Sequence, residues 1–199
     1  MLILIVLAMP KRQPRRPLII VFVGEKLAGK EIASHYLRHR HKFASYRFSK
    51  ILVDLLDRLH LPVTRVNEMN LVGGLRERFG GGVLAEVIKA EISKRKERRV
   101  VIDGLRHPAE LEVLKSLPGF LLVYLTAPLE LRFRRARTRG EKVGERTFTL
   151  ADFKREEKLP TEVFIRRLGR QAKVRLENSG TLPELYHQIE EKIVRAYLK

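Results

Sequence analysis

The chain has 199 residues, 44% of them hydrophobic, which is enough for one domain with a packed core and excludes wholesale disorder. It has no cysteine, which excludes disulfides and thiolate metal sites and favours a reducing, cytoplasmic location. The formal net charge of +18 favours partners rich in phosphate, such as nucleotides or nucleic acid, although an evenly basic, solvated surface explains the same charge.

The N-terminal 17 residues form an apolar and then basic extension. Residues 1–9 are apolar, too few to cross a bilayer, which needs about 20 residues. No basic segment precedes them and no cleavage site of small residues follows, so we expect neither a signal peptide nor membrane insertion. Either the native chain begins at Met9, or the extension adds an edge strand. The domain itself is expected to span 18–199.

Apolar runs and helical periodicity alternate along the rest of the chain. Strands are predicted at 18–23, 42–48, 99–103, 120–125 and 173–177. Helices are predicted at 29–40, 50–59, 67–79, 83–98, 108–117 and 128–139. A further short helix is predicted inside 140–160, with Thr149 and Asp152 as its capping box, and the last helix runs from a capping box at Thr181 and Glu184 to the C-terminus. Ser49 is the expected N-cap of the second helix, and Gly73-Gly74 is expected to interrupt the third. This alternation predicts a three-layer α/β fold with a five-stranded parallel sheet.

The first strand runs directly into a glycine loop, and a helix follows. The loop reads Gly24-Glu25-Lys26-Leu27-Ala28-Gly29-Lys30, the Gly-x4-Gly-Lys spacing of a phosphate-binding P-loop. Inward-facing N–H groups, the helix N-terminus and the lysine would together bind phosphate. The alternative is a tight turn in which the glycines only supply positive φ. Glu31 departs from the motif, because a Walker loop has Ser or Thr there to hold Mg²⁺.

Several further candidates follow later strands. Gly24, Asp103 and Thr126 end strands, so a parallel sheet would bring them to one edge. Asp103 would hold Mg²⁺ through water and Arg106 would clamp a phosphate, unless Asp103 only caps the next helix.

An arginine row follows the fourth strand. Arg132, Arg135 and Arg139 share one face of the predicted helix 128–139. There they would neutralise charge on a transferring phosphoryl group, unless the helix is simply exposed and basic.

Four motifs together resemble the adenylate-kinase-like P-loop kinases, within them the deoxynucleoside monophosphate kinase and dephospho-CoA kinase-like branch. They are Gly24-x4-Gly29-Lys30, Arg76-x-x-Phe79-Gly80, Val101-Ile-Asp103-Gly104-x-Arg106-x-Pro108 and Ala127-Pro128-Leu-Glu-x-Arg132. The closing Asn178-Ser-Gly180-Thr181 is similar to that branch's last strand-to-helix turn.

The resemblance implies a P-loop NTPase fold with a small helical lid at 140–160 and an acceptor-binding segment at 42–98. It implies that the glycine loop holds ATP, that Asn178 and Gly180 lie near adenine, and that Ser49 and Arg76 contact the acceptor. The arginine row would then belong to the lid and its supporting helix.

We therefore expect an ATP- and Mg²⁺-dependent kinase whose substrates are nucleotides. The acceptor would carry a phosphate itself and is expected to be a nucleoside or deoxynucleoside monophosphate, with dephospho-CoA as a further candidate. A different reading is a catalytically degenerate P-loop protein that binds nucleotide or RNA, suggested by Glu31 and the +18 charge. Nucleic acid is the less favoured partner, and the sequence specifies neither monomer nor dimer.

Overall fold

The computed structural model describes residues 16–139, 149–158 and 160–198, with the backbone alone for 160–163. Residues 1–15 of the N-terminal extension lie outside the described residues, so neither interpretation of that extension is tested. The predicted lid at 140–160 is described from residue 149 onward, apart from residue 159.

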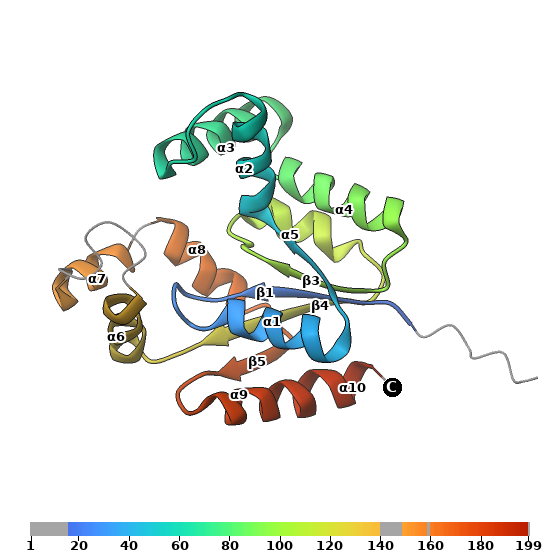
Figure 1. Cartoon of the computed structure of the whole chain (residues 1–199), viewed down its shortest axis with the longest axis vertical. Coiled ribbons are helices and arrows are strands. Elements are labelled where there is room, and N and C mark those ends of the chain that lie inside the picture. Colours follow the sequence, from blue (N-terminus) through green and yellow to red (C-terminus); the bar gives the residue numbers. More distant parts are fainter. Residues whose placement is uncertain (1–15, 140–148, 159, 199) are drawn as a thin grey trace, which may run out of the picture.

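Five parallel strands form one sheet in the order β2-β3-β1-β4-β5 (Figure 1). The strands are β1 (Leu18–Val23), β2 (Ala44–Arg47), β3 (Arg99–Asp103), β4 (Phe120–Thr126) and β5 (Val174–Glu177). In the register, Val21 of β1 pairs with Ile102 of β3, and Val23 pairs with Tyr124 of β4. The carboxyl end of β1 therefore lies between those of β3 and β4.

Helices cover both faces of the sheet, which confirms the predicted three-layer α/β fold (Figure 1). They are α1 (Lys30–His41), α2 (Phe48–Arg58), α3 (Arg65–Phe79), α4 (Val83–Arg95), α5 (Pro108–Lys115), α6 (Leu129–Arg139), α7 (Leu150–Glu156), α8 (Pro160–Gly169), α9 (Leu182–Ile189), the π-helical turn η1 (Glu190–Val194) and α10 (Arg195–Tyr197).

Successive side chains of β1 point alternately into two separate hydrophobic cores. Ile19, Val21 and Val23 face the core built with α2, α4, α5 and α8. Leu18, Ile20 and Phe22 face the core built with α1, α9 and η1. All six residues of β1 are buried, as expected for a central parallel strand. A strand packed this tightly on both faces gives the following loop a rigid base.

Two predicted helix boundaries were wrong. α2 begins at Phe48 with Arg47 as its N-cap, so Ser49 lies inside the first turn and does not cap the helix. Phe48 is buried, and its packing extends the helix beyond the residue that local capping preference selects. α3 runs without interruption through Gly73-Gly74.

Two predicted capping boxes are confirmed, and one predicted alternative is corrected. Thr149 caps α7 with Asp152, and Thr181 caps α9 with Glu184. α5 is capped by His107, whose side chain accepts from the Ala109 amide; Asp103 is not its cap.

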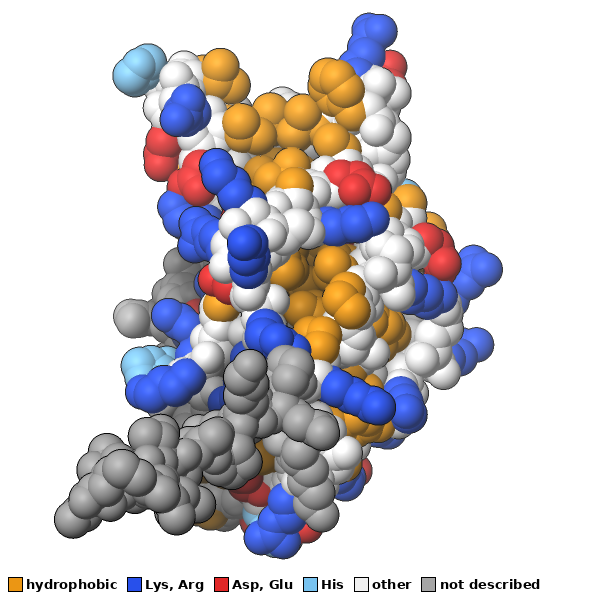
Figure 2. Space-filling model, turned by 90° about the vertical axis from the view of Figure 1, so that its right-hand side faces the viewer, with side chains coloured by type: hydrophobic (Ala, Val, Ile, Leu, Met, Phe, Trp, Pro, Cys, Tyr) orange, Lys and Arg blue, Asp and Glu red, His pale blue; other side chains and the backbone are white. Residues whose placement is uncertain are grey.

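Exposed apolar side chains gather on the arm formed by α2, α3 and their connection (Figure 2). They include Leu59, Leu61, Val63, Val66, Met69 and Phe79. α3 has no buried residue, although its half-buried Leu71, Val72 and Leu75 pack against the first core. Within the described residues, no helix is both long and apolar enough to cross a membrane.

Because α3 continues through two glycines, we expect Gly73→Ala to stabilise the protein by about 0.5–1 kcal/mol. A Cβ at Gly73 would meet no atom within 4 Å. Gly119→Ala is the opposing comparison, because Gly119 has φ +75° and its Cβ would overlap the Pro17 carbonyl. It should destabilise by about 2 kcal/mol or more. Urea unfolding measures both, and a destabilising Gly73→Ala would contradict the continuous helix.

Candidate functional site

The glycine loop leaves the centre of the sheet at the carboxyl end of β1. Gly24 packs against the main chain of β4, where a Cβ would overlap the carbonyl oxygen of Leu125. Gly29 has φ +107° and precedes α1 directly, while Leu27 has φ +62°. Both glycines are thus required by geometry, the first by close approach and the second by its left-handed conformation.

Side-chain donors contact five successive carbonyl groups of this loop. Lys30 donates to Gly24 O at 2.7 Å and to Glu25 O at 2.9 Å. Arg132 Nη1 lies 3.4 Å from Lys26 O. Arg135 Nη1 donates to Leu27 O at 3.2 Å, and Asn178 Nδ2 donates to Ala28 O at 2.9 Å.

The direction of these carbonyls fixes the direction of the loop amides. In a planar trans peptide, the C=O group and the following N–H point in opposite directions. Where Leu27 O and Ala28 O face Arg135 and Asn178, the N–H groups of the same peptides face the other way. One of them, Ala28 N–H, closes a turn onto Glu25 O at 3.2 Å. This arrangement, followed by the N-terminus of α1, has the form of an anion-binding nest.

Two of the predicted catalytic arginines, Arg132 and Arg135, contact main-chain carbonyls of the glycine loop. Arg132 is buried and forms a two-pronged ion pair with Glu157, with distances of 2.7 and 3.0 Å. Its Nε donates to Ala127 O at 2.9 Å. Burial lowers the pKa of Arg132, but the Glu157 carboxylate outweighs this effect and raises it overall. Arg132 therefore joins α6 to the end of α7.

A second contact joins the same segments. Lys26 Nζ lies 3.1 Å from Glu156 Oε2, and both Lys26 and Arg132 lie over the ring of Phe153. Arg166 of α8 donates to Glu157 O at 2.8 Å. The described part of the predicted lid thus rests on the loop through charged side chains.

Of the remaining predicted residues on this side, two are exposed and one is buried. Arg139 is exposed at the end of α6, beside the undescribed residues 140–148. Gly180 is exposed in the turn before α9. Asn178 is buried, and its main-chain N–H donates to Thr126 O at 2.8 Å, which ties the end of β5 to the end of β4.

Glu25 belongs to the loop, but its side chain turns back into the protein. It is 5% exposed, and its Oε1 accepts a hydrogen bond from the Tyr124 hydroxyl. Oε2 is buried without a hydrogen-bond partner among the described residues. Burial, and then the Glu25 carboxylate, raise the pKa of Tyr124 to about 12, so the tyrosine remains a donor at neutral pH.

Asp103 lies at the predicted edge of the sheet, beside the glycine loop. Its Oδ1 accepts from the Gly104 amide at 2.7 Å, and β3, which it ends, pairs with β1. Glu31 lies at the surface instead, with its side chain 69% exposed and paired to Arg47 at 3.0 Å. One carboxylate near the loop suits Mg²⁺, which takes its other ligands from phosphate and water. No group of three acidic or histidine ligands occurs among the described residues.

The predicted acceptor contacts are partly brought together by Glu110, a buried residue of α5. Arg76 Nη2 of α3 donates to Glu110 Oε1 at 2.6 Å, and the Arg106 amide donates to Oε2 at 3.2 Å. Arg106 itself is exposed. Ser49 is also exposed, and its neighbour Phe48 packs beside Gly104. These side chains surround the carboxyl end of β3.

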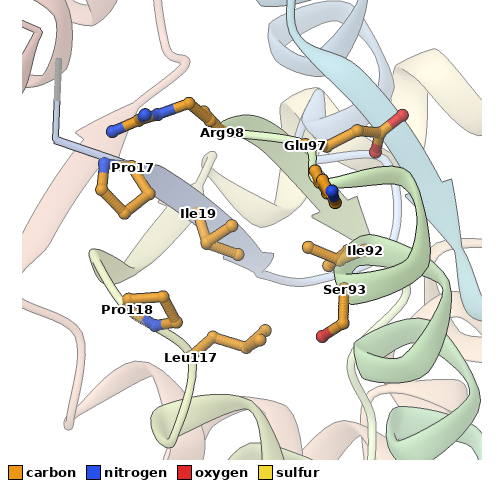
Figure 3. A pocket seen from close by; sticks show the side chains of 9 residues that line it. Pro17, Ile19, Ile92, Ser93, Glu97, Arg98, Leu117 and Pro118 are labelled. Carbon is orange, nitrogen blue, oxygen red and sulfur yellow. The ribbon is translucent and has the colours of Figure 1, made fainter. Parts of the chain in front are cut away.

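A hollow of about 240 Å³ lies at the opposite, amino edge of the sheet (Figure 3). Its apolar lining includes Ile19, Ile92 and Leu117, and Arg98 and Glu97 lie at its side. Each lining segment precedes or begins a strand, so the hollow is separate from the glycine loop.

Sequence reasoning missed Tyr124, Glu157, Arg47 and Glu110. Tyr124 was placed in a buried strand without a role, and Glu157 lay inside the predicted lid. Their roles depend on partners 99 and 25 residues away in the chain. The local signal for Tyr124 is a hydroxyl group within an apolar run, whereas Glu157 lies among charged neighbours and carries no such signal.

No family model matches the chain. Among curated proteins, a UPF0200 protein from Methanoregula boonei is 30% identical over 143 residues, 67% of this chain and 72% of that protein. The chain belongs to the UPF0200 family. A UPF0200/UPF0201 protein from Archaeoglobus fulgidus is 27% identical over 185 residues, so this UPF0200 chain spans about half (55%) of that relative's length. Deoxycytidylate deaminase from Schizosaccharomyces pombe is 31% identical over 117 residues, only 31% of that protein.

Solved structures show the fold of this UPF0200 protein. TT1252 from Thermus thermophilus matches with a TM-score of 0.62 at 18% identity, covering 93% of this chain and all (100%) of that one. Shikimate kinase from Aquifex aeolicus matches with a TM-score of 0.57 at 18% identity, covering 90% and 98%. At these identities the likeness establishes a shared three-layer α/β fold and neither an activity nor a substrate.

The buried Arg132–Glu157 pair gives a stability prediction. Their side chains are 5% and 8% exposed. Glu157→Leu leaves a buried guanidinium without its counter-charge and should cost about 3–5 kcal/mol in urea unfolding. The double variant Arg132→Met/Glu157→Leu should recover most of that loss, because neither charge is then buried. Equal losses in the single and double variants would show that the pair is not the source of the effect.

Proposed function

We propose that this protein transfers the terminal phosphoryl group of ATP to a small acceptor that already carries a phosphate. The observation behind the proposal is the set of five successive loop carbonyls bonded to Lys30, Arg132, Arg135 and Asn178. A merely tight turn between strand and helix needs no such set of donors. A loop that must present its amides to phosphate needs its carbonyls held away.

Within this proposal, each part of the site has a separate role. The loop amides and the N-terminus of α1 would bind the β- and γ-phosphates, and Lys30 would add its charge beside them. Mg²⁺, held by Asp103 through water, would neutralise charge on the phosphates. The segment 140–160 would exclude water, so that the acceptor is phosphorylated rather than the solvent.

A nucleoside or deoxynucleoside monophosphate is the acceptor we propose, with dephospho-CoA as the other candidate. The arm 42–98 contributes Arg76, which Glu110 holds close to the Arg106 turn. The exposed guanidinium of Arg106 suits a phosphate on the acceptor, whereas the charge of Arg76 is paired with Glu110. The partial similarity to a protein named for deoxycytidylate supports a nucleotide acceptor.

One observation favours a second candidate, a P-loop protein that binds nucleotide or RNA without catalysis. Glu31 replaces the usual metal-binding hydroxyl, and its carboxylate is paired at the surface with Arg47. A panel of nucleoside monophosphates and dephospho-CoA, each with ATP and Mg²⁺, separates the two. Nucleotide binding without turnover of any acceptor, together with RNA binding that falls steeply with salt, would favour the second candidate.

Lys30→Ala should lower phosphoryl transfer about 100- to 1,000-fold, because it removes a positive charge beside the transferring group. Circular dichroism should show an unchanged fold, since Lys30 is only partly buried. Lys94→Ala, at the exposed end of α4, is the control and should behave as wild type. Full activity in Lys30→Ala would remove the support for a P-loop mechanism.

Asp103→Asn should raise the Mg²⁺ concentration needed for half-maximal activity about tenfold or more, because it removes the carboxylate charge at the loop. ATP binding in EDTA should change far less, which separates metal binding from nucleotide binding. Glu112→Gln, on the exposed side of α5, controls for the loss of one negative charge. An unchanged Mg²⁺ requirement in Asp103→Asn would exclude this role.

A further inference from the structure

Arg135 and Asn178 form a closed set of bonds with the glycine loop. Arg135 sits on α6 and uses both arms of its guanidinium: Nη1 donates to Leu27 O at 3.2 Å, and Nη2 donates to Asn178 O at 3.0 Å. The Asn178 side chain then donates to Ala28 O at 2.9 Å. Three segments that are distant in sequence, the loop, α6 and the end of β5, are thereby cross-linked.

The position of Asn178 leaves little freedom to the loop. Its side chain is 2% exposed, and its main-chain amide is fixed to Thr126 O. A Cβ on Gly29 would overlap its amide nitrogen, so the carboxamide lies directly against the last glycine of the loop. Asn178 therefore contacts the protein's own main chain, in addition to the place near adenine that the family resemblance implies.

Arg135 is likewise directed at carbonyls. Burial lowers the pKa of its guanidinium. Neighbouring Arg132 is paired with the Glu157 carboxylate, whereas Arg135 keeps its charge and directs it at carbonyl oxygens. Both arginines were predicted to neutralise a phosphoryl group, and the structure instead bonds both to main-chain carbonyls of the loop region.

We infer that Arg135 and Asn178 are positioning residues: they hold the carbonyls of Leu27 and Ala28 outward and thereby keep the loop in the shape that binds phosphate. This inference rests on the proposed function, since that function defines what the loop binds. They act through the Ala28–Glu25 turn and through the direction of the Gly29 N–H, without contacting the nucleotide themselves.

Arg135 could support phosphate binding through the shape it gives the loop or through its positive charge, and Arg135→Lys distinguishes the two. Lysine keeps the positive charge, but its single ammonium group does not reproduce the flat fork that spans two carbonyls. A group that acts by charge on the phosphates would tolerate the change well. A group that braces the loop would not.

The measurement uses the whole protein labelled with ¹⁵N, first without nucleotide. In Arg135→Lys, the amide resonances of residues 25–30 should shift or broaden while the melting temperature stays close to that of wild type. ATP affinity by calorimetry, in EDTA and in Mg²⁺, should fall about tenfold. Arg137→Lys, an exposed position on the same helix, is the matched control and should change neither.

Asn178→Leu provides an independent test, because it removes the donor to Ala28 O while keeping a side chain of similar size. It should perturb the same amides and weaken ATP binding, with Arg135 still in place. Weaker ATP binding with unchanged loop resonances in the nucleotide-free Arg135→Lys protein would overturn the inference in favour of direct contact. Unchanged ATP affinity in both variants would also overturn it. If wild type itself binds no ATP, the proposed function fails, whereas the nucleotide-free spectra still test the bracing.

Discussion

A loop that presents its peptide N–H groups to an anion must turn its carbonyls the other way, and buried carbonyls need donors. In this protein, Lys30, Arg132, Arg135 and Asn178 supply them across five successive residues. The rest of the fold positions these donors against the loop carbonyls. The central strand β1 fixes where the loop begins. α6 and the turn after β5 supply three of the donors, Arg132, Arg135 and Asn178, and α1 supplies Lys30.

The same donors connect the loop to the described part of the lid. Arg132 bonds to Lys26 O and to Glu157 at the end of α7, while the Lys26 side chain pairs with Glu156. The conformation of the loop and the position of α7 therefore depend on the same two residues, Lys26 and Arg132. We expect a change in the loop to alter the position of α7, and the reverse, because the buried Arg132–Glu157 pair that links them tolerates little change in geometry. This coupling arises from contacts within the protein and does not require a nucleotide.

The sequence predicted the parts that depend on local pattern. All five strands were predicted: apolar runs located β1, β3 and β4, and aromatics near alternation located β2. The Gly24–Lys30 spacing located the loop. The sequence also placed Arg132 and Arg135 correctly on one helical face. Helical periodicity cannot specify what that face meets, because this depends on how α6 packs against the loop. A role of these arginines toward a phosphoryl group therefore stays a prediction, while their described contacts are to main-chain carbonyls and, for Arg132, to Glu157. Glu157 and Tyr124 were missed because their partners are remote in sequence.

Charge at the site and charge on the whole protein must be distinguished. The net charge is +18, but Arg132 is paired with Glu157, Arg135 is bonded to carbonyls, and Glu25 places a carboxylate beneath the loop. Much of the positive charge near the loop is thus engaged by the protein itself. Attraction for phosphate at this site would come chiefly from oriented amides, the α1 terminus and Lys30, which act at short range. The remaining positive charge lies on the surface, where salt screens it, so it does not by itself argue for a nucleic-acid partner.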